Sequence, residues 1–169
     1  MRFLSPLLLA ALTLLTACDD ASDVSVEYRH IRLHAMLAEK ATTIPVVFHA
    51  SPGSNVDAYL LSALSRQSEK MELPGLRFAP STKRPLADMT IEVAYQPDRT
   101  LSGISLCQHK QIGGRETSGK SVTLAIALCH DGRRLSSVRG GVPLPGDTEG
   151  NAAALTTLID GMTAALIGR

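Results

Sequence analysis

The sequence contains no tryptophan, and only three tyrosines and three phenylalanines among its 169 residues. Proteins that bind single-stranded nucleic acids stack the bases on aromatic rings, so this composition argues against a nucleic-acid partner. The low aromatic content argues against a sugar-binding cleft as well. Excess charge is also missing, since 17 Lys and Arg oppose 16 Asp and Glu. We therefore expect no strong attraction to nucleic acid or to anionic lipid from the overall charge.

Known catalytic motifs are absent too. The sequence contains neither the G-x-S-x-G of serine hydrolases nor the H-E-x-x-H of zinc proteases. Its carboxylates are scattered, with no pair that is positioned to act as general acid and base. We therefore predict a protein that is not an enzyme and has no cofactor. One alternative stays open: a hydrolase whose Ser, His and Asp or Glu converge only in the folded chain.

A long apolar run occurs at the N-terminus. Residues 3–17 are almost wholly apolar and follow Arg2, which is the layout of a secretory signal. The run is shorter than the roughly 20 residues that a membrane-spanning helix needs. We therefore predict an exported protein.

The apolar run ends in the tetrapeptide LTAC at residues 15–18. It resembles the lipobox of bacterial lipoproteins, in which the cysteine becomes the first residue of the mature chain and carries a diacylglyceryl group on its sulfur. The resemblance implies a signal peptide at 1–17, lipidation of Cys18 and a lipid anchor on the periplasmic face of a Gram-negative membrane. More than one acyl chain is enough for stable anchoring.

Asp19 and Asp20 follow the cysteine directly. In some enteric bacteria, an aspartate at this place resembles the mark that keeps a lipoprotein in the inner membrane. The rule does not hold in every bacterium, so the membrane stays open, with the inner one favoured. The mature chain would have 152 residues, enough for one domain. We expect a tether at 18–26 and a single α+β periplasmic domain at 27–169.

The two other cysteines are Cys107 and Cys129. In an exported, oxidising compartment, an even number of remaining cysteines predicts one disulfide. Nearby histidines allow an alternative, in which these thiolates together with His109 and His130 bind zinc or copper. Against a metal, neighbouring residues on a strand point to opposite faces, so Cys129 and His130 cannot easily share one ion. We predict the disulfide and no metal site.

Two further groups of polar residues have simple explanations. His30 and His34 have the spacing of metal ligands on a helix, but solvated histidines are the expectation. Arg133 and Arg134 follow a turn signal at Asp131-Gly132 and have the chemistry to bind a carboxylate or phosphate. A solvated turn is the expectation there.

Residues 114–121 match G-x-x-x-x-G-K-[ST], the pattern of a phosphate-binding loop. A working loop of this kind follows a buried strand and opens a helix whose N-terminus holds the anion. Here a polar segment precedes the match, and the alternating, β-branched run SVTLAIALCH follows it. Ser121 is therefore predicted to begin a strand, and no nucleotide is expected.

Periodicity along the rest of the chain predicts a mixture of helices and strands. Alternation predicts strands at 44–49, 89–95, 121–130 and 133–142, with further short strands at 76–79 and 101–109. In the strand at 89–95, Thr90 and Glu92 are expected on a solvent-facing side. Helical spacing of apolar residues predicts helices after residue 54 and from about 151, and propensity favours another at 27–40. The predicted fold is α+β, with a single antiparallel sheet of about four strands covered on one face by two amphipathic helices.

The segments IPVVFHASPG, LCQHK and VTLAIALCHDGRRLSSVRGGV are similar to a loose group of small lipoproteins of Gram-negative envelopes. In that group the two cysteines recur as a pair, as Cys107 and Cys129 do here, and no activity is available to transfer. The order of elements is also similar to envelope-assembly lipoproteins that bind partner proteins. We therefore expect a non-enzymatic binding or accessory component of the envelope, with a metal-binding lipoprotein as the alternative.

Overall fold

The computed structural model describes most of the chain after the predicted signal segment. The described residues are 22–39, 43–49, 54–73, 75–82, 89–108 and 120–168. Within them lie one six-stranded sheet and four helices. The predicted lipidation site Cys18 and most of the 114–121 motif lie outside this part of the chain.

The sheet is mixed and has the strand order β1-β6-β5-β4-β2-β3. The pairs β1–β6, β6–β5 and β5–β4 are antiparallel, whereas β2 runs parallel to both β4 and β3. The predicted α+β class is confirmed, but the sheet has six strands rather than about four and is not purely antiparallel. The strands are β1 (Asp23–Arg29), β2 (Thr43–His49), β3 (Arg77–Ser81), β4 (Met89–Tyr95), β5 (Ser121–His130) and β6 (Arg133–Pro143).

The parallel part of the sheet follows from a helical connection. Helix α2 (Ser54–Lys70) joins β2 to β3, so the chain crosses back before it adds the next strand in the same direction. Parallel neighbours need such a crossover, whereas a tight turn produces antiparallel ones. Alternation in the sequence shows which residues share a face of a strand but not which strand lies beside it. The prediction of a purely antiparallel sheet was wrong for this reason.

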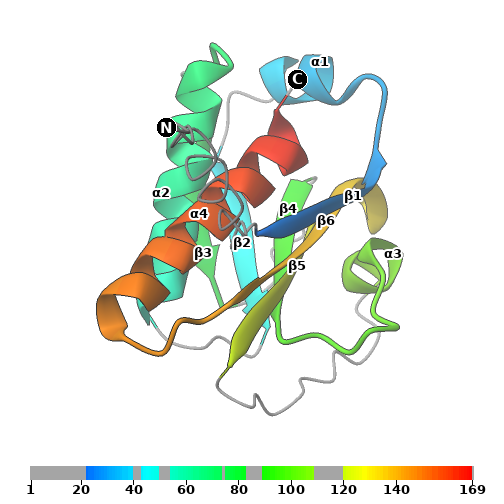
Figure 1. Cartoon of the computed structure of the whole chain (residues 1–169). Coiled ribbons are helices and arrows are strands. Elements are labelled where there is room, and N and C mark those ends of the chain that lie inside the picture. The colour runs from blue at the N-terminus through cyan, green and yellow to red at the C-terminus, as the bar shows by residue number, and fades with distance from the viewer. Residues whose placement is uncertain are drawn as a thin grey trace, which may run out of the picture.

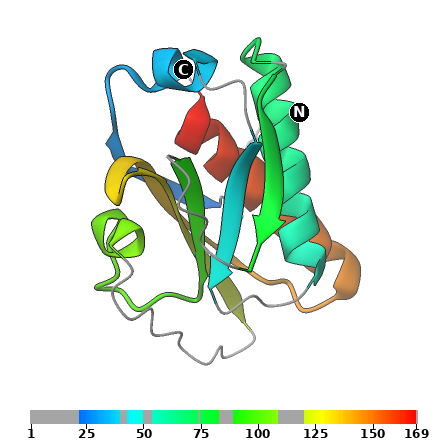
Figure 2. The same ribbon diagram turned by 180° about the vertical axis from the view of Figure 1, so that it is seen from behind.

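Two long helices cover one face of the sheet, as predicted. Figures 1 and 2 show α2 and α4 (Thr148–Ile167) side by side across that face. Alternate residues of the central strands, such as Ile91 and Ile126, point into the layer between sheet and helices and are fully buried. Burial of such a side chain stabilises a fold by about 1.5–3 kcal/mol. The helix α1 (Leu33–Glu39) adds Leu33 and Leu37 to the same core.

The opposite face carries a short helix where a strand was expected. Residues 101–109 alternate weakly, but Gly103–Cys107 forms the helix α3, whose backbone N–H at Ser105 is capped by the Ser102 hydroxyl. This helix packs over β5 and β6. The prediction of a strand at 101–109 was therefore wrong. A second, smaller core of mostly small residues lies beneath α3: Ala94, Leu101, Leu106, Cys107, Ala125, Ala127 and Cys129.

The first strand corrects two expectations. Residues 23–29 pair with β6, so the predicted helix at 27–40 is a strand followed by a shorter helix that begins at Leu33. Helix propensity in the tail of this segment suggested one continuous helix, but pairing with β6 decided its first half. The strand also begins within the expected tether, because residues 23–26 belong to the sheet.

The hairpin between β5 and β6 is confirmed. His130 pairs with Arg133, and the two residues between them, Asp131 and Gly132, both have positive φ angles of 49° and 72°. Such a turn matches the twist of the flanking strands, and glycine adopts this conformation without steric cost. The strand that Ser121 was predicted to begin is confirmed as well.

Candidate functional site

The disulfide is the first of the predicted site features that the structure describes. Cys107 in α3 is joined to Cys129 in β5, with 5.5 Å between their Cα atoms. Both residues are buried, so the bond ties α3 to the sheet from within the smaller core. Since each sulfur is bonded to the other, neither is a thiolate ligand, which removes two of the four groups of the metal alternative.

The histidines of the metal alternatives do not gather. His30 precedes α1, where its Nδ1 accepts from the backbone N–H of Arg32, and His34 lies 3.4 Å from the carbonyl oxygen of Met71. They do not share one helix face, as the spacing had suggested. His130 has Asp131 as its neighbour at 3.9 Å, and His109 lies outside the described residues. In the part of the chain that the structure describes, no three His, Cys, Asp or Glu residues lie close enough to hold a metal ion.

Glu27 is the centre of a polar network that sequence reasoning missed. Glu27 lies in β1 between Val26 and Tyr28, where the register of pairing with β6 shifts. One carboxylate oxygen accepts from the backbone N–H of Gly103 at 3.1 Å and from the hydroxyl of Ser137 at 3.2 Å. The network therefore joins α3 to both β1 and β6.

Arg139 completes this network. Its Nε lies 3.5 Å from the other oxygen of Glu27, and its Nη2 donates to the carbonyl oxygen of Leu101 just before α3. Both charged side chains are about three-quarters buried, at 22% exposure for Arg139 and 25% for Glu27. The pair therefore holds the segment before α3 against the edge of the sheet, which is a structural role.

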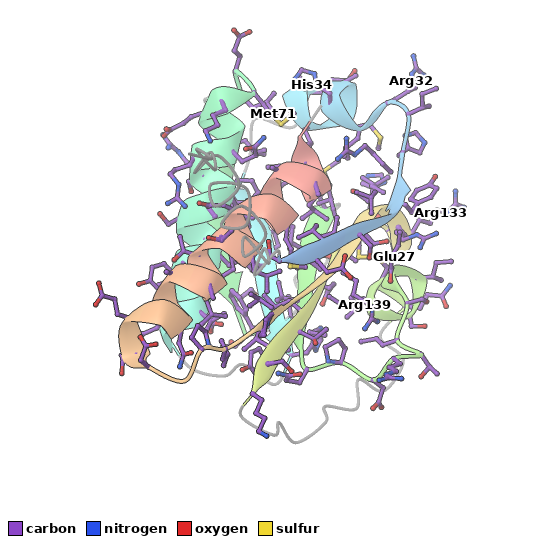
Figure 3. All side chains as sticks on the ribbon, in the orientation of Figure 1. Glu27, Arg32, His34, Met71, Arg133 and Arg139 are labelled. Carbon is purple, nitrogen blue, oxygen red and sulfur yellow. A yellow bond between two sulfur atoms is a disulfide. The ribbon has the colours of Figure 1, made fainter. Side chains whose placement is uncertain are left out.

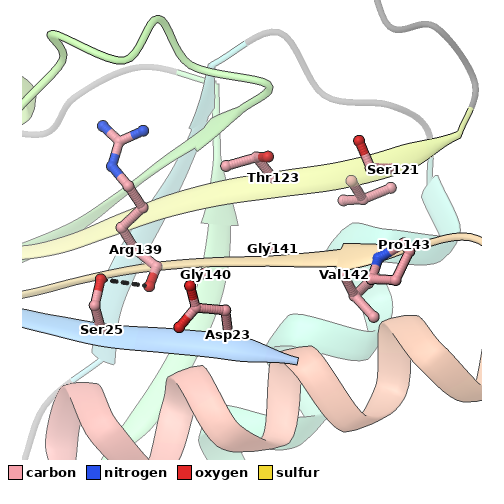
Figure 4. A pocket seen from close by; sticks show the side chains of 10 residues that line it. Asp23, Ser25, Ser121, Thr123, Arg139, Gly140, Gly141, Val142 and Pro143 are labelled. Atoms are coloured by element: carbon pink, nitrogen blue, oxygen red, sulfur yellow. Dashed lines mark hydrogen bonds between the residues drawn. The ribbon is translucent and has the colours of Figure 1, made fainter. Parts of the chain in front are cut away.

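A shallow depression lies beside Arg139 on the same face (Figure 4). Its volume is about 390 Å³, and Gly141 leaves room there because it has no side chain. Thr123 and Asp23 flank Gly141 in the register of β5, β6 and β1. Hydroxyl and carboxylate groups here can bind a small polar molecule, but most of the guanidinium of Arg139 is already engaged in the network.

His49 and Glu92 form a second polar pair on this face. The Nε2 of His49 lies 2.7 Å from a carboxylate oxygen of Glu92, whose side chain is fully buried. Thr90 and Glu92 were predicted to face solvent, and both are buried instead. An imidazole oriented by a carboxylate is one half of an activated nucleophile site. The His49–Glu92 pair could therefore serve the hydrolase alternative only if a nucleophilic side chain also lay beside the imidazole.

Among the described residues, no strand pairs with the outer edge of β1, and exposed apolar side chains lie in or next to this strand. Val26 is 50% exposed, Tyr28 is 37% exposed, and Ile31, just beyond the strand, is 97% exposed. Strand edges offer unpaired backbone groups to a partner, and natural proteins usually protect them. Ile104 of the adjacent α3 is also exposed. This side of the molecule therefore combines exposed apolar side chains with an edge strand.

The expectation of a solvated turn at the arginine pair holds only for Arg133. Arg134 is not simply solvated, because its guanidinium lies over the ring of Tyr28, 4.5 Å from the ring centre, whereas Arg133 is exposed. Among the described residues, no helix is both long and apolar enough to cross a membrane.

Comparison with known proteins shows a fold but no family. No protein-family model and no curated protein matches the chain. Among solved structures, it is similar to the PelC dodecamer from Paraburkholderia phytofirmans, with 13% identity and a TM-score of 0.50 over 88% of this chain and 99% of that chain. A single-residue variant of the same dodecamer matches with 14% identity and a TM-score of 0.50, over 88% of this chain and 100% of that one. At this identity, the comparison shows that the chain shares a fold with the PelC subunit.

Proposed function

We propose that the protein is a lipoprotein of the Gram-negative periplasm, anchored through Cys18, whose domain binds another envelope component and is not an enzyme. The anchor is supported by the LTAC tetrapeptide at the end of an apolar segment. It is also consistent with an oxidised Cys107–Cys129 pair, since disulfides persist outside the cytoplasm. The aspartates after Cys18 favour the inner membrane.

The binding role rests on one observation, the outer edge of β1, which no strand of the described part of the chain pairs with, together with its half-exposed Val26. A partner can add a strand along such an edge and bury the apolar side chain in the same step. The fold itself is compatible with assembly, because the PelC subunit that shares it occurs in a dodecamer. A second copy of the chain or a different envelope protein would fit this edge.

Crosslinking in native membranes tests the binding role. We expect the anchored protein to crosslink to a defined partner, identified by mass spectrometry, and Val26→Asp to lose that product because a charge would have to be buried. Tyr59→Asp is the matched control, since Tyr59 is an exposed apolar residue on α2, away from β1. Equal crosslinking by both variants would show that the β1 edge is not the binding surface.

The anchor has its own test. The N-terminal peptide of the protein purified from membranes should begin at Cys18 and carry the added mass of its acyl chains. Cys18→Ala should leave the precursor uncleaved, because only cysteine offers the sulfur to which the lipid is transferred. Normal mature protein in the membrane from Cys18→Ala would refute the anchor while leaving the crosslinking result to stand.

A further inference from the structure

Two segments that are far apart in the sequence meet beyond the end of β1. We define the basic corner as residues 28–34, which run from β1 into α1, together with residues 130–134 around the β5–β6 turn. The backbone N–H of His30 donates to the carbonyl oxygen of Leu135 at 2.7 Å. The guanidinium of Arg134 covers the ring of Tyr28. These contacts make the two segments one continuous surface.

The basic corner has a local excess of positive charge. Its charged side chains are those of Arg29, Arg32, Arg133, Arg134 and Asp131. Arg29 is engaged with α4, but Arg32 and Arg133 are exposed and lie on the same side of the molecule in Figure 3. In a chain whose basic and acidic residues nearly balance, four arginines against one aspartate are a strong local bias.

An exposed apolar residue stands within this positive surface. Ile31 is 97% exposed, and Tyr28, whose ring Arg134 covers, is 37% exposed. Apolar side chains among arginines suit the boundary between lipid headgroups and acyl chains, where the apolar groups insert and the cations meet phosphates. The corner therefore combines the two interactions that hold a protein surface on an anionic bilayer.

We infer that the basic corner docks on anionic phospholipid headgroups of the membrane to which Cys18 is anchored. The inference rests on the proposed lipid anchor, which keeps the domain close to that membrane. Four residues separate Cys18 from Asp23 at the start of β1, and the five steps between successive Cα atoms span at most about 17 Å when extended. β1 itself rises about 20 Å from Asp23 to Arg29. The anchor therefore holds the start of β1 within about 17 Å of the bilayer, and a domain tilted toward the membrane can bring the corner to the surface.

Docking at this corner leaves the outer edge of β1 available for a protein partner. The corner lies past the C-terminal end of the strand, whereas Val26 lies within it. A short tether and a docked corner together give the domain one orientation, whereas a tether alone lets it tumble.

Amide hydrogen exchange on vesicles tests the docking. The protein purified from membranes is reconstituted into phosphatidylcholine vesicles, with or without about 30 mol% phosphatidylglycerol. We expect exchange in residues 28–34 and 130–134 to slow about threefold or more only when phosphatidylglycerol is present. About 0.5 M salt should abolish most of the slowing by screening the charges.

Matched variants locate the effect. Arg32→Glu combined with Arg133→Glu should remove the slowing, since each surface arginine contributes about fivefold in affinity for an anionic membrane. Arg77→Glu combined with Arg99→Glu makes the same charge change at exposed arginines outside the corner, and it should retain the slowing. Arg32→Lys combined with Arg133→Lys keeps both charges and should retain it as well.

Three outcomes would overturn the inference. Equal exchange on both kinds of vesicle would show that anionic headgroups are not recognised. If amide exchange in the corner also slows in detergent, and slows more at higher protein concentration, a second copy of the chain covers the corner. Loss of slowing in the Arg77 and Arg99 variant would show a response to total charge. The mass of the N-terminal peptide tests the anchor separately. If that peptide carries no acyl chains, the protein can still be mixed with the same vesicles, and its hydrogen exchange then tests the docking alone.

Discussion

Arg29, the last residue of β1, donates a hydrogen bond from its guanidinium to the carbonyl oxygen of Ala165 in the last turn of α4. α4 has no basic residue of its own in that turn. The guanidinium therefore supplies a cation at the negative end of the helix and satisfies a carbonyl that has no partner within it. Through this contact, the first strand holds the last helix.

Replacing Arg29 should loosen this junction. We expect Arg29→Gln to lower the free energy of unfolding by about 1 kcal/mol, because a hydrogen bond from a charged group and its interaction with the helix end are both lost. Arg99→Gln, at an exposed turn position, is the control and should change it by less than about 0.5 kcal/mol. Chemical denaturation measures both, and equal effects would contradict the capping role.

Gly103 should not tolerate a side chain. A Cβ atom there would lie 2.3 Å from the Cβ of Ser137, which is closer than two carbons can approach. We expect Gly103→Ala to push α3 off β6 and to cost about 1–3 kcal/mol. In Gly161→Ala, the new Cβ would lie 3.4 Å from Val24, and the helix propensity of alanine should stabilise α4 by about 0.5–1 kcal/mol. We therefore expect Gly103→Ala to lower the melting temperature and Gly161→Ala to raise it.

The disulfide should carry a measurable share of the stability. The two cysteines are 22 residues apart, and closing a loop of that size stabilises a fold by about 3 kcal/mol in the chain-entropy model. We expect the double variant Cys107→Ala, Cys129→Ala to unfold at a lower temperature, and added reductant to have no further effect on it. A thiol count on the unreduced native protein should find neither of these cysteines free. Two free thiols with copurified zinc or copper would instead support the metal alternative.

His49 and Glu92 should be energetically coupled. Removing His49 takes one hydrogen-bond partner from a fully buried carboxylate, and such losses in low-dielectric surroundings are costly. We expect His49→Phe and Glu92→Gln each to destabilise the fold, and the double variant to lose less than the sum of the two by about 1 kcal/mol or more. Strict additivity in denaturation experiments would mean that the 2.7 Å contact contributes nothing to stability.

The central hairpin and the two long helices were predictable because their signals are local. Alternation in 121–130, the Asp131-Gly132 turn and the apolar stripe of α4 each specify a structure within a few residues. The polar networks were not predictable in the same way. The residues next to Glu27 in the sequence form no motif that indicates a polar network. Its contacts with Gly103 and Ser137 exist only because β1 lies beside β6 and beneath α3.

The chain by itself determined the α+β class, the faces of its main strands and helices, and the cysteines available for pairing, because these depend on periodicity and residue type. Tertiary structure decided that 23–29 is an edge strand, that 103–107 is a helix and that Glu92 is buried. It also gathered Arg32 and Arg133 at one corner of a chain with almost no net charge. Such features arise from contacts between distant segments, and no window of the sequence contains both partners.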